Sequence, residues 1–311
     1  MSSDLLQPVD ITAFRAGNTG VDYVHRLDSG HAGPEVLITA LMHGNELCGA
    51  HALKHLFEHD VRPRHGALTL AFCNVAAYES YDPERPTASR ALDEDMNRLW
   101  RDDIIAEGAA RSREAERAGA LLPFVQRAEW ILDIHSMQTG PEALTLCGAH
   151  SRGRDLAVRM GLPRFIVSDA GHKAGPRMRD YGPFGAAEGP HTALLIECGQ
   201  HQEPHAATVA IRAAWRFLEV LEQADAPADV SAPAAEQIFV TVTAPVTIES
   251  DDFRFEPVVE NLKIIDKAGT LIAHDGDREI RTPYDDCILI MPSKRLYPGQ
   301  TAVRLGRVTA S

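Results

Sequence analysis

The sequence lacks any hydrophobic run long enough to span a membrane, which takes about 18 to 20 apolar residues. Its opening residues lack the cationic start and apolar stretch of a secretion signal, so we expect a cytoplasmic protein with no membrane partner. The sequence also contains no Gly-x-x-x-x-Gly-Lys phosphate loop and no Gly-x-Ser-x-Gly elbow. These absences argue against nucleotide hydrolysis and against serine hydrolase chemistry.

Cysteine and basic residues are both in short supply. The five cysteines are odd in number and form no Cys-x-x-Cys pair, which argues against a redox motif or a zinc ribbon. We expect reduced thiols, most of them buried. Lys and Arg number 31 against 44 Asp and Glu, giving a formal charge of −13. Because such a chain repels polyanions, we expect no nucleic acid partner.

The length of 311 residues, with 44% hydrophobic and 24% charged residues, is typical of a soluble globular protein with two structural units. In the first two thirds of the chain, short apolar runs alternate with longer helical patterns. The predicted strands are Val36–Leu41, Leu68–Asn74, Trp130–His135, Ala143–Cys147, Arg164–Ser168 and Thr192–Cys198, and the predicted helices are Asn45–Glu58, Arg111–Gln126, Arg152–Met160 and Pro204–Gln223. Strands that are apolar on both faces are typical of a sheet covered by helices, so this part is predicted to be α/β.

The composition changes around residues 226–236, which are rich in Ala, Pro and acidic residues and show no periodicity. Such a segment indicates a linker. Beyond it, short β-like runs separated by turn residues predict a small all-β domain; they are Ile238–Val242, Val258–Ile265 and Cys287–Met291. The predicted organisation is therefore a catalytic domain over residues 1–225, the linker, and a β domain over residues 237–311.

The first chemically suggestive motif follows the predicted strand Val36–Leu41, which runs into Met42-His43-Gly44-Asn45-Glu46 and then a helical pattern. In open α/β folds, ligands bind at such strand ends. The spacing of three brings His43 and Glu46 to one side of the first helical turn, where an imidazole and a carboxylate can form half of a zinc site. The alternative is a simple turn in which Glu46 is favoured by the dipole of the helix.

A second strand end carries Asp133 and His135, which alternation places on one face of the strand. Together with His43 and Glu46, His135 completes a His, Glu, His set with an open fourth position, as in catalytic zinc sites. Asp133 is then predicted to accept a hydrogen bond from a ligand imidazole, with a surface salt bridge as the alternative.

A third strand end places Glu197 after a strongly apolar run. Because burying an unpaired carboxylate is costly, Glu197 requires a cation, a metal-bound water or a raised pKa, and we predict it to be the general base. A structural ion pair with an arginine is the alternative. Arg90 and Arg98 lie in a polar loop between the first two strand ends; their guanidinium groups suit a substrate carboxylate or a developing oxyanion, unless the loop is merely solvated.

Four motifs thus occur in order: His-Gly-Asn-Glu, Asp-x-Asn-Arg, Asp-x-His and Ile-Glu-x-Gly. This combination resembles the succinylglutamate desuccinylase and aspartoacylase family of zinc-dependent N-acyl amino acid amidohydrolases, a branch of the zinc carboxypeptidase fold. The resemblance covers most of residues 30–200, and the layout of a smaller β domain behind them. It implies an α/β fold with a zinc-carboxypeptidase-like mixed sheet flanked by helices, a smaller C-terminal all-β domain, and one Zn²⁺ per chain.

The resemblance also implies roles for individual side chains. Zinc ligands would be His43, Glu46 and His135; Glu197 would be the catalytic base and acid; Arg90 would polarise the scissile carbonyl; Asn97 and Arg98 would hold the carboxylate of the substrate. The implied reaction is hydrolysis of the amide bond of a small N-acyl amino acid or related N-acyl amine, in which a zinc-bound water attacks with Glu197 as base. The alternatives are a metallocarboxypeptidase acting on short peptides and a noncatalytic protein that binds ligands in a zinc pocket.

The chain departs from the family pattern in its substrate-binding segments. After His135 it reads Ser-Met-Gln-Thr-Gly, and no arginine stands upstream of Glu197 where the aspartoacylase branch has its second anchor for the acyl carboxylate. Further substrate-binding candidates are Arg177, Arg179 and Tyr181 in the loop over residues 170–190, and Tyr284 in the small domain, where an ordinary β-turn tyrosine is the alternative. The acyl group, the amine and any assembly into a homo-oligomer stay open.

Overall fold

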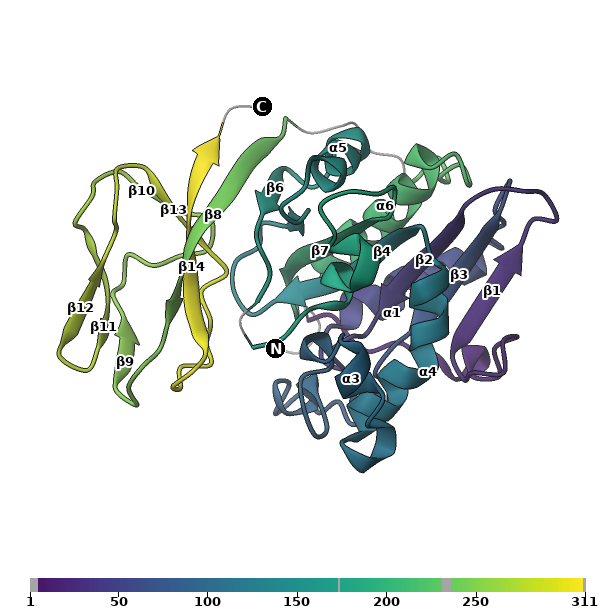
Figure 1. Ribbon diagram of the computed structural model, residues 1–311, viewed down its shortest axis with the longest axis horizontal. Helices are drawn as coiled ribbons and strands as arrows, with labels where there is room; N and C mark the ends of the chain where they lie inside the picture. Colours follow the sequence, from purple (N-terminus) through teal and green to yellow (C-terminus); the bar gives the residue numbers. More distant parts are fainter. Residues whose placement is uncertain (1–4, 173, 231–235, 310–311) are drawn as a thin grey trace.

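The computed structural model describes residues 5–172, 174–230 and 236–309, and within them the main feature is an eleven-stranded mixed sheet (Figure 1). The strands follow one another across it in the order β1-β3-β2-β4-β7-β5-β6-β8-β14-β13-β10. Their bounds are β1 Val24–Asp28, β2 Glu35–Ala40, β3 Ala67–Phe72, β4 Trp130–Met137, β5 Leu144–Leu146, β6 Phe165–Ser168, β7 Thr192–Gln200, β8 Ile238–Thr247, β10 Ile264–Ile265, β13 Cys287–Ile290 and β14 Thr301–Thr309. The predicted α/β fold with a mixed sheet is confirmed.

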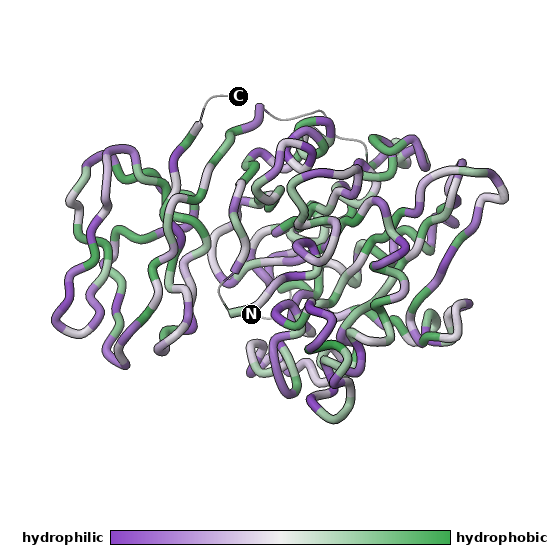
Figure 2. Tube along the Cα trace, in the orientation of Figure 1, coloured by the Kyte–Doolittle hydropathy of each residue, from purple (hydrophilic) through white to green (hydrophobic). Residues whose placement is uncertain are grey.

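Helices cover both faces of the first part of this sheet. They are α1 Leu47–Glu58, α2 Val75–Glu79, α3 Asp102–Ile105, α4 Arg113–Arg127, α5 Ser151–Met160 and α6 Pro204–Val220. The apolar residues of α1, α5 and α6 share one core with alternate residues of the central strands, and those of α4 share another core on the opposite face. Along β2, Ile38 belongs to the first core and Leu37 to the second, as strand alternation requires. Figure 2 shows hydrophobic residues on the central strands and hydrophilic ones on many outer loops.

The centre of the sheet is parallel, and this brings the predicted strand ends together. Strands β3, β2, β4 and β7 are neighbours with parallel pairing. In the register, Ala40 lies opposite Ile134, and His135 lies opposite Glu197. The residues that follow β2, the end of β4 and the end of β7 therefore meet at one edge of the sheet, where open α/β folds bind their ligands.

The C-terminal β region continues the same sheet. Strand β8 pairs in parallel with β6, and β14, β13 and β10 extend the sheet with antiparallel pairing. A separate three-stranded sheet, in the order β12-β11-β9, completes the region; its strands are β9 Phe253–Phe255, β11 Leu271–Asp275 and β12 Arg278–Arg281. Of the predicted linker 226–236, residues 231–235 lie outside the described residues.

The prediction of a strand over Val258–Ile265 is wrong for most of its length, because only Ile264–Ile265 pairs as β10. Leu262 adopts a left-handed backbone with φ of 59°, and the side chain of Asn261 accepts a hydrogen bond from the backbone of Met291. The segment is therefore a loop beside β13, to which it is joined by backbone hydrogen bonds from Leu262 to Leu289 and from Leu289 to Lys263. Strand β12 escaped prediction because its sequence, Arg-Glu-Ile-Arg, is exposed and polar.

Two other expectations concern the whole chain. All five cysteines are free and buried, as predicted. Among the residues that the structure describes, no helix has the combined length and hydrophobicity needed to cross a bilayer.

The pairing of β6 with β8 predicts that the two parts of the chain unfold together, since one core contains Leu144 and Val167 from before residue 226 and Val240 and Ile288 from beyond residue 236. Ile288→Ala creates a cavity in this shared core and is expected to cost about 2 to 5 kcal/mol. All three tryptophans precede residue 226, so their fluorescence during urea unfolding reports on the first part.

We expect the fluorescence midpoint to fall in Ile288→Ala and to stay unchanged in Ile264→Ala, because Ile264, the pairing partner of Ile288 on β10, is 45% exposed. An unchanged midpoint in Ile288→Ala, with loss of β structure at lower urea, would contradict a shared core.

Candidate active site

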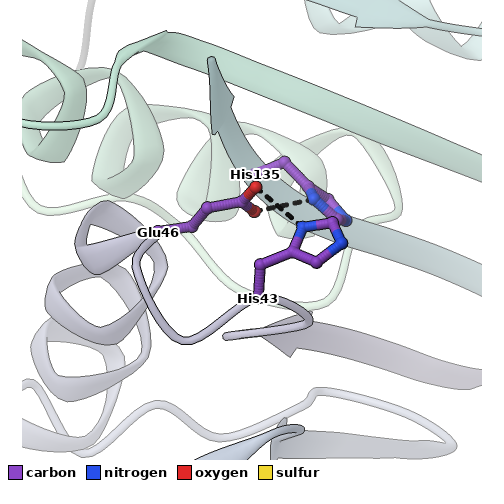
Figure 3. A group of neighbouring side chains, drawn as sticks. All are labelled: His43, Glu46 and His135. Atoms are coloured by element: carbon purple, nitrogen blue, oxygen red, sulfur yellow. Dashed lines mark hydrogen bonds and ion pairs between the residues drawn. The ribbon is translucent and has the colours of Figure 1, made fainter. Parts of the chain in front are cut away.

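Three buried side chains, His43, Glu46 and His135, converge at the edge of the sheet (Figure 3). Glu46 lies between the two imidazoles: its Oε1 is 2.8 Å from Nδ1 of His43, and its Oε2 is 2.8 Å from Nδ1 of His135. One potential ligand atom from each residue lies within 4.8 Å of the others. This set of two imidazole nitrogens and a carboxylate suits a divalent transition metal, zinc above all.

The backbone that carries His43 and Glu46 is a tight connection between β2 and α1. Leu41 adopts a left-handed conformation, with φ of 60°, where the strand ends. Gly44 then passes close to the backbone of α2 and of the segment that follows it. A Cβ on Gly44 would lie 2.3 Å from the carbonyl carbon of Ala77 and 2.5 Å from the carbonyl oxygen of Ser89. Only glycine fits at this position, and its amide donates to the carbonyl of Arg90.

Each imidazole has a second carboxylate behind it. Nε2 of His135 lies 2.8 Å from Oδ2 of Asp133, whose other oxygen accepts from the hydroxyl of Thr39. Nε2 of His43 lies 2.8 Å from Oδ1 of Asp95. Each carboxylate can accept a hydrogen bond from Nε2, and at His135 this leaves the Nδ1 lone pair of the neutral imidazole toward Glu46. At His43 the same Nε2 also lies 2.7 Å from Nη2 of Arg90, and Nδ1 lies at hydrogen-bond distance from Oε1 of Glu46.

At His135 this arrangement leaves one acceptor, Nδ1, facing another, Oε2 of Glu46, which tests whether a cation fits there. Oε2 of Glu46 is buried and has no hydrogen bond among the described residues, because its contact with His135 lacks hydrogen-bond geometry. A buried carboxylate in this state requires a positive charge. The donor set therefore fits a metal ion held by His43, Glu46 and His135.

The same conclusion follows from the ionisation of these groups without a metal. Burial acts to raise the pKa of Glu46, but the charges of His43 and His135 outweigh it and hold this pKa well below its ordinary value. Burial acts to lower the pKa of His135, but Asp133 and Glu46 outweigh it and raise this pKa well above its ordinary value. Without a metal ion, a proton on His135 thus supplies positive charge beside Glu46.

Glu197 lies beside this centre, opposite His135 in the register of β4 and β7. Burial, assisted by the charges of Glu46 and Asp133, raises its pKa to about 8 against the opposing charges of His135 and Arg90. Its Oε2 is buried with no hydrogen bond among the described residues. A carboxyl group of this kind can hold or release a proton near neutral pH.

Arg90 closes the site from the loop before Asp95. Its Nη2 donates to Oδ2 of Asp95 at 2.8 Å, and its Nη1 lies 3.5 Å from Oε1 of Glu46. Burial acts to lower the pKa of Arg90, but Asp95 and Glu46 outweigh it and raise this pKa above its ordinary value. Asp95 therefore orients both a candidate ligand, His43, and the neighbouring guanidinium, a role that the sequence analysis did not assign to it.

A single cavity contains most of the predicted site residues. It is lined by His43, Glu46, Arg90, Asn97, Arg98, His135, Arg177 and Glu197, together with residues of the C-terminal β region such as Ser293, Arg295 and Arg304. The side-chain oxygen of Asn97 accepts from the amide of Met178, which leaves its NH₂ group toward His135. Arg177 is held in place by Asp169 and Asp180, to which both Nη atoms and its Nε donate.

Three predicted substrate-binding residues do not line this cavity. Arg179 donates to the carbonyls of Cys147 and Ala193 on the far side of the loop. The hydroxyl of Tyr181 donates to Asp102. The hydroxyl of Tyr284 lies 2.5 Å from that of Thr243, and its ring lies under Arg307 within the C-terminal region. The hydroxyls of both tyrosines and the Nη atoms of Arg179 thus have partners within the fold, whereas Nε of Arg179 is buried with no hydrogen bond to a described residue.

The structure adds a histidine that the sequence analysis missed. His201 follows β7, four residues after Glu197. It is buried and lines the cavity, and its Nδ1 lies at hydrogen-bond distance, 2.8 Å, from the hydroxyl of Ser136. Its Nε2 is buried with no partner among the described residues. The only sequence signal was its distance from Glu197, which is weak without the register of the sheet.

Burial lowers the pKa of His201 to about 4, so the folded protein resists its protonation while the unfolded chain titrates near 6.5. Stability from this residue is therefore present above pH 6.5 and is lost as pH falls toward 4. In chelator-treated protein, lowering the pH from 7.5 to 5 is expected to decrease the free energy of unfolding of the wild type. We expect this decrease to be about 2 kcal/mol smaller in His201→Gln. His205→Gln, at an exposed histidine nearby, should behave as the wild type. Urea unfolding at both pH values measures this, and equal losses in all three proteins would contradict it.

Comparison with known proteins finds a matching family model and similar folds. Residues 32–183 match the model of the succinylglutamate desuccinylase/aspartoacylase catalytic domain. Similar solved structures include the succinylglutamate desuccinylase of Vibrio parahaemolyticus, with a TM-score of 0.67 and 17% identity over 93% of this chain and 87% of that one. The succinylglutamate desuccinylase of Chromobacterium violaceum gives a TM-score of 0.65 at 17% identity over 94% and 90% of the two chains.

A third similar structure is the product-bound ectoine utilization protein EutE (DoeB) of Ruegeria pomeroyi, with a TM-score of 0.61 and 17% identity over 91% of this chain and 88% of that one. At such identities the structures establish a common fold, which extends across the C-terminal β region. A search of curated proteins gave no match.

Proposed function

The chain belongs, through residues 32–183, to the succinylglutamate desuccinylase/aspartoacylase family, and we propose that it is a zinc-dependent deacylase that hydrolyses the amide bond of a small N-acyl amino acid or related N-acyl amine. The observation that carries the proposal is the buried His43, Glu46 and His135 group with Glu197 beside it in one cavity. Two imidazole nitrogens, one carboxylate and a vacant direction toward the cavity are the requirements of a hydrolytic zinc site.

One Zn²⁺ per chain, held by His43, Glu46 and His135, would supply Lewis-acid polarisation of the amide carbonyl and lower the pKa of water at the site. Asp133 favours the tautomer of His135 with Nδ1 free, which is the form a metal ligand needs, and Asp95 orients the ring of His43 at its Nε2. Replacing Asp95 or Asp133 would leave all three ligands in place but would remove the hydrogen bond that orients one imidazole.

Glu197 moves the proton in this proposal. Its carboxylate takes a proton from the attacking water as the new C–O bond forms, and returns it to the amide nitrogen as the C–N bond breaks. The products are a carboxylic acid and an amine. The high pKa of Glu197, caused by its burial, makes the carboxyl able both to accept and to release this proton.

Arg90 and Arg98 have different tasks. Arg90, fixed by Asp95 beside the metal ligands, directs its guanidinium toward the oxygen that becomes negative as water adds to the carbonyl. Arg98 donates only to the backbone carbonyl of Asn97 among the described residues, which leaves donors for a carboxylate of the substrate. Asn97 holds its NH₂ group at the same end of the cavity.

The wall supplied by the C-terminal region favours small substrates over peptides. The segment after β13 is fastened over the site, since the amide of Lys294 donates to the side chain of Gln138 at 2.7 Å and Thr139 donates to the carbonyl of Pro292 at 3.0 Å. A peptide extending beyond one residue would have to displace this segment. Comparable turnover of N-acyl amino acids and of longer peptides would argue for the carboxypeptidase alternative.

Glu197→Gln tests the proton transfer. The amide cannot accept the proton, so kcat is expected to fall by about 100- to 10,000-fold while zinc content is retained. Glu203→Gln, which changes an exposed glutamate six residues further along, is the matched control and should keep full turnover. Steady-state hydrolysis of a panel of N-acyl amino acids, with zinc measured on the same samples, decides the outcome. Near-normal turnover by Glu197→Gln would reject this mechanism.

Metal removal tests the ligand set. Chelation is expected to abolish hydrolysis and to lower the melting temperature, and zinc to restore both, because a ligand at about 1,000 times its Kd stabilises the folded state by about 4 kcal/mol. His43→Ala should lose most of the bound zinc, whereas His31→Ala, at an exposed histidine, should retain one ion per chain. Full zinc stoichiometry in His43→Ala would remove His43 from the ligand set.

A further inference from the structure

The cavity has a second wall that the reaction described above does not use. This wall comes from the C-terminal β region and includes Arg295, in the segment after β13, and Arg304 on β14. Strand β14 lies between β13 and β8, where Arg304 pairs with Ile290 and with Pro245. Because β8 in turn pairs with β6, the position of Arg304 is set by the same continuous sheet that carries Glu197.

The arginines around the cavity fall into two groups. Arg90 and Arg177 are neutralised by carboxylates at hydrogen-bond distance. Arg98, Arg295 and Arg304, by contrast, have no carboxylate partner within the described part of the chain. Arg304 has no side-chain hydrogen bond or ion pair to any described residue, and Nε of Arg295 is buried with no hydrogen bond to one.

Partner-free guanidinium groups are unusual in a partly buried position, because taking the charge from water costs free energy that a partner normally offsets. Burial lowers the pKa of Arg304, and the charges of Asp169 and, more weakly, Glu197 oppose this. Both oxygens of Asp169 already accept from Arg177, and neither carboxylate forms an ion pair or hydrogen bond with Arg304.

A neighbouring histidine reports the resulting positive potential. His172 lines the same cavity, and burial together with the charges of Arg98, Arg304 and Arg177 lowers its pKa to about 3. Two of these three arginines have no carboxylate partner of their own in the described residues. Burial, the largest cause, disfavours any charge at His172, whereas the charges of the arginines add a positive potential that favours an anion in this part of the cavity.

We infer that Arg304, assisted by Arg295, forms a second anion subsite, so that the substrate carries a carboxylate there in addition to the one held at Arg98. This inference rests on the proposed deacylase function. It makes the C-terminal β region a determinant of substrate choice, through a guanidinium that reaches the cavity from β14. The second carboxylate has two chemical sources, the acyl chain or the side chain of the amino acid, and matched substrates separate them.

The first experiment uses pairs of substrates that differ only in one carboxylate. N-succinyl-alanine against N-succinamoyl-alanine tests the acyl end, and N-acetyl-aspartate against N-acetyl-asparagine tests the amino acid side chain. For one of the two pairs, we expect the wild type to prefer the acid, and Arg304→Gln to reduce this preference in kcat/KM by about 10- to 100-fold, the range typical of a lost charge-assisted hydrogen bond.

Three further variants sharpen the result. The loss should fall mainly on KM and only for the acid, since the neutral analogue makes no bond to Arg304. Arg304→Lys should restore part of the preference, and Arg295→Gln should reduce it less than Arg304→Gln. Arg307→Gln, on the same strand but exposed and stacked on Tyr284, is the matched control and should leave the preference unchanged. An unchanged preference in Arg304→Gln for both pairs would overturn the inference.

The second experiment separates this inference from the proposed function. Calorimetry on chelator-treated protein measures binding of succinate and of its monoamide, neither of which requires turnover. Tighter binding of succinate by the wild type, lost in Arg304→Gln and kept in Arg307→Gln, would support the subsite even if no amide were hydrolysed. Equal binding of succinate and its monoamide by the wild type, or equal preference in both variants, would overturn the subsite even if hydrolysis were found.

Discussion

The site depends on one buried carboxylate, Glu46, which lies between two imidazoles. Its Oε1 lies 2.8 Å from Nδ1 of His43 and 3.5 Å from Nη1 of Arg90, but its Oε2, 2.8 Å from Nδ1 of His135, has no hydrogen bond among the described residues. A cation beside Glu46 compensates this buried charge, and without one the raised pKa of His135 keeps a proton on that imidazole. The cost of burying the charge of Glu46 and the affinity of the site for a cation thus have the same electrostatic origin.

The sheet solves the positional part of this problem. Parallel strands end at the same edge, and the register that sets His135 opposite Glu197 fixes the candidate base beside the ligand group without any flexible connection. The close passage of Gly44 against the backbone of Ala77 in α2 and of Ser89 fixes the His43 turn at the same edge. Groups held on strands and tight turns lose little entropy when a substrate binds, which favours precise proton transfer.

Charge within the cavity is divided between positions that the fold has neutralised and positions that it has left open. Carboxylates at hydrogen-bond distance hold Arg90 and Arg177 in place, so these side chains act as fixed parts of the wall. Arg98 and Arg304 line the cavity with guanidinium groups that have no carboxylate partner among the described residues. The overall charge of −13 gives no hint of this local surplus, because the compensating acids lie elsewhere on the molecule.

The sequence by itself determined the α/β class, the strands that end at the site, and the residue types that converge there, because apolar runs and polar strand ends are local patterns. His43, Glu46, His135 and Glu197 each follow or end such a run. It could not reveal the extension of the sheet from β6 into β8, nor the hairpin of β11 and the polar β12, because strand pairing at a distance leaves no local periodicity.

Only the tertiary structure decided which of the loop residues face the cavity. Arg177 and Arg179 are two residues apart, yet the first lines the cavity and the second turns to backbone carbonyls behind it. Likewise His201 and Arg304 carry no distinctive local pattern, and Asp95, although it begins the Asp-x-Asn-Arg motif, is seen to contact His43, 52 residues away, only in the structure. Side-chain direction and the pairing of buried charges result from packing. The sequence determines this packing, but no local pattern in the sequence indicates it.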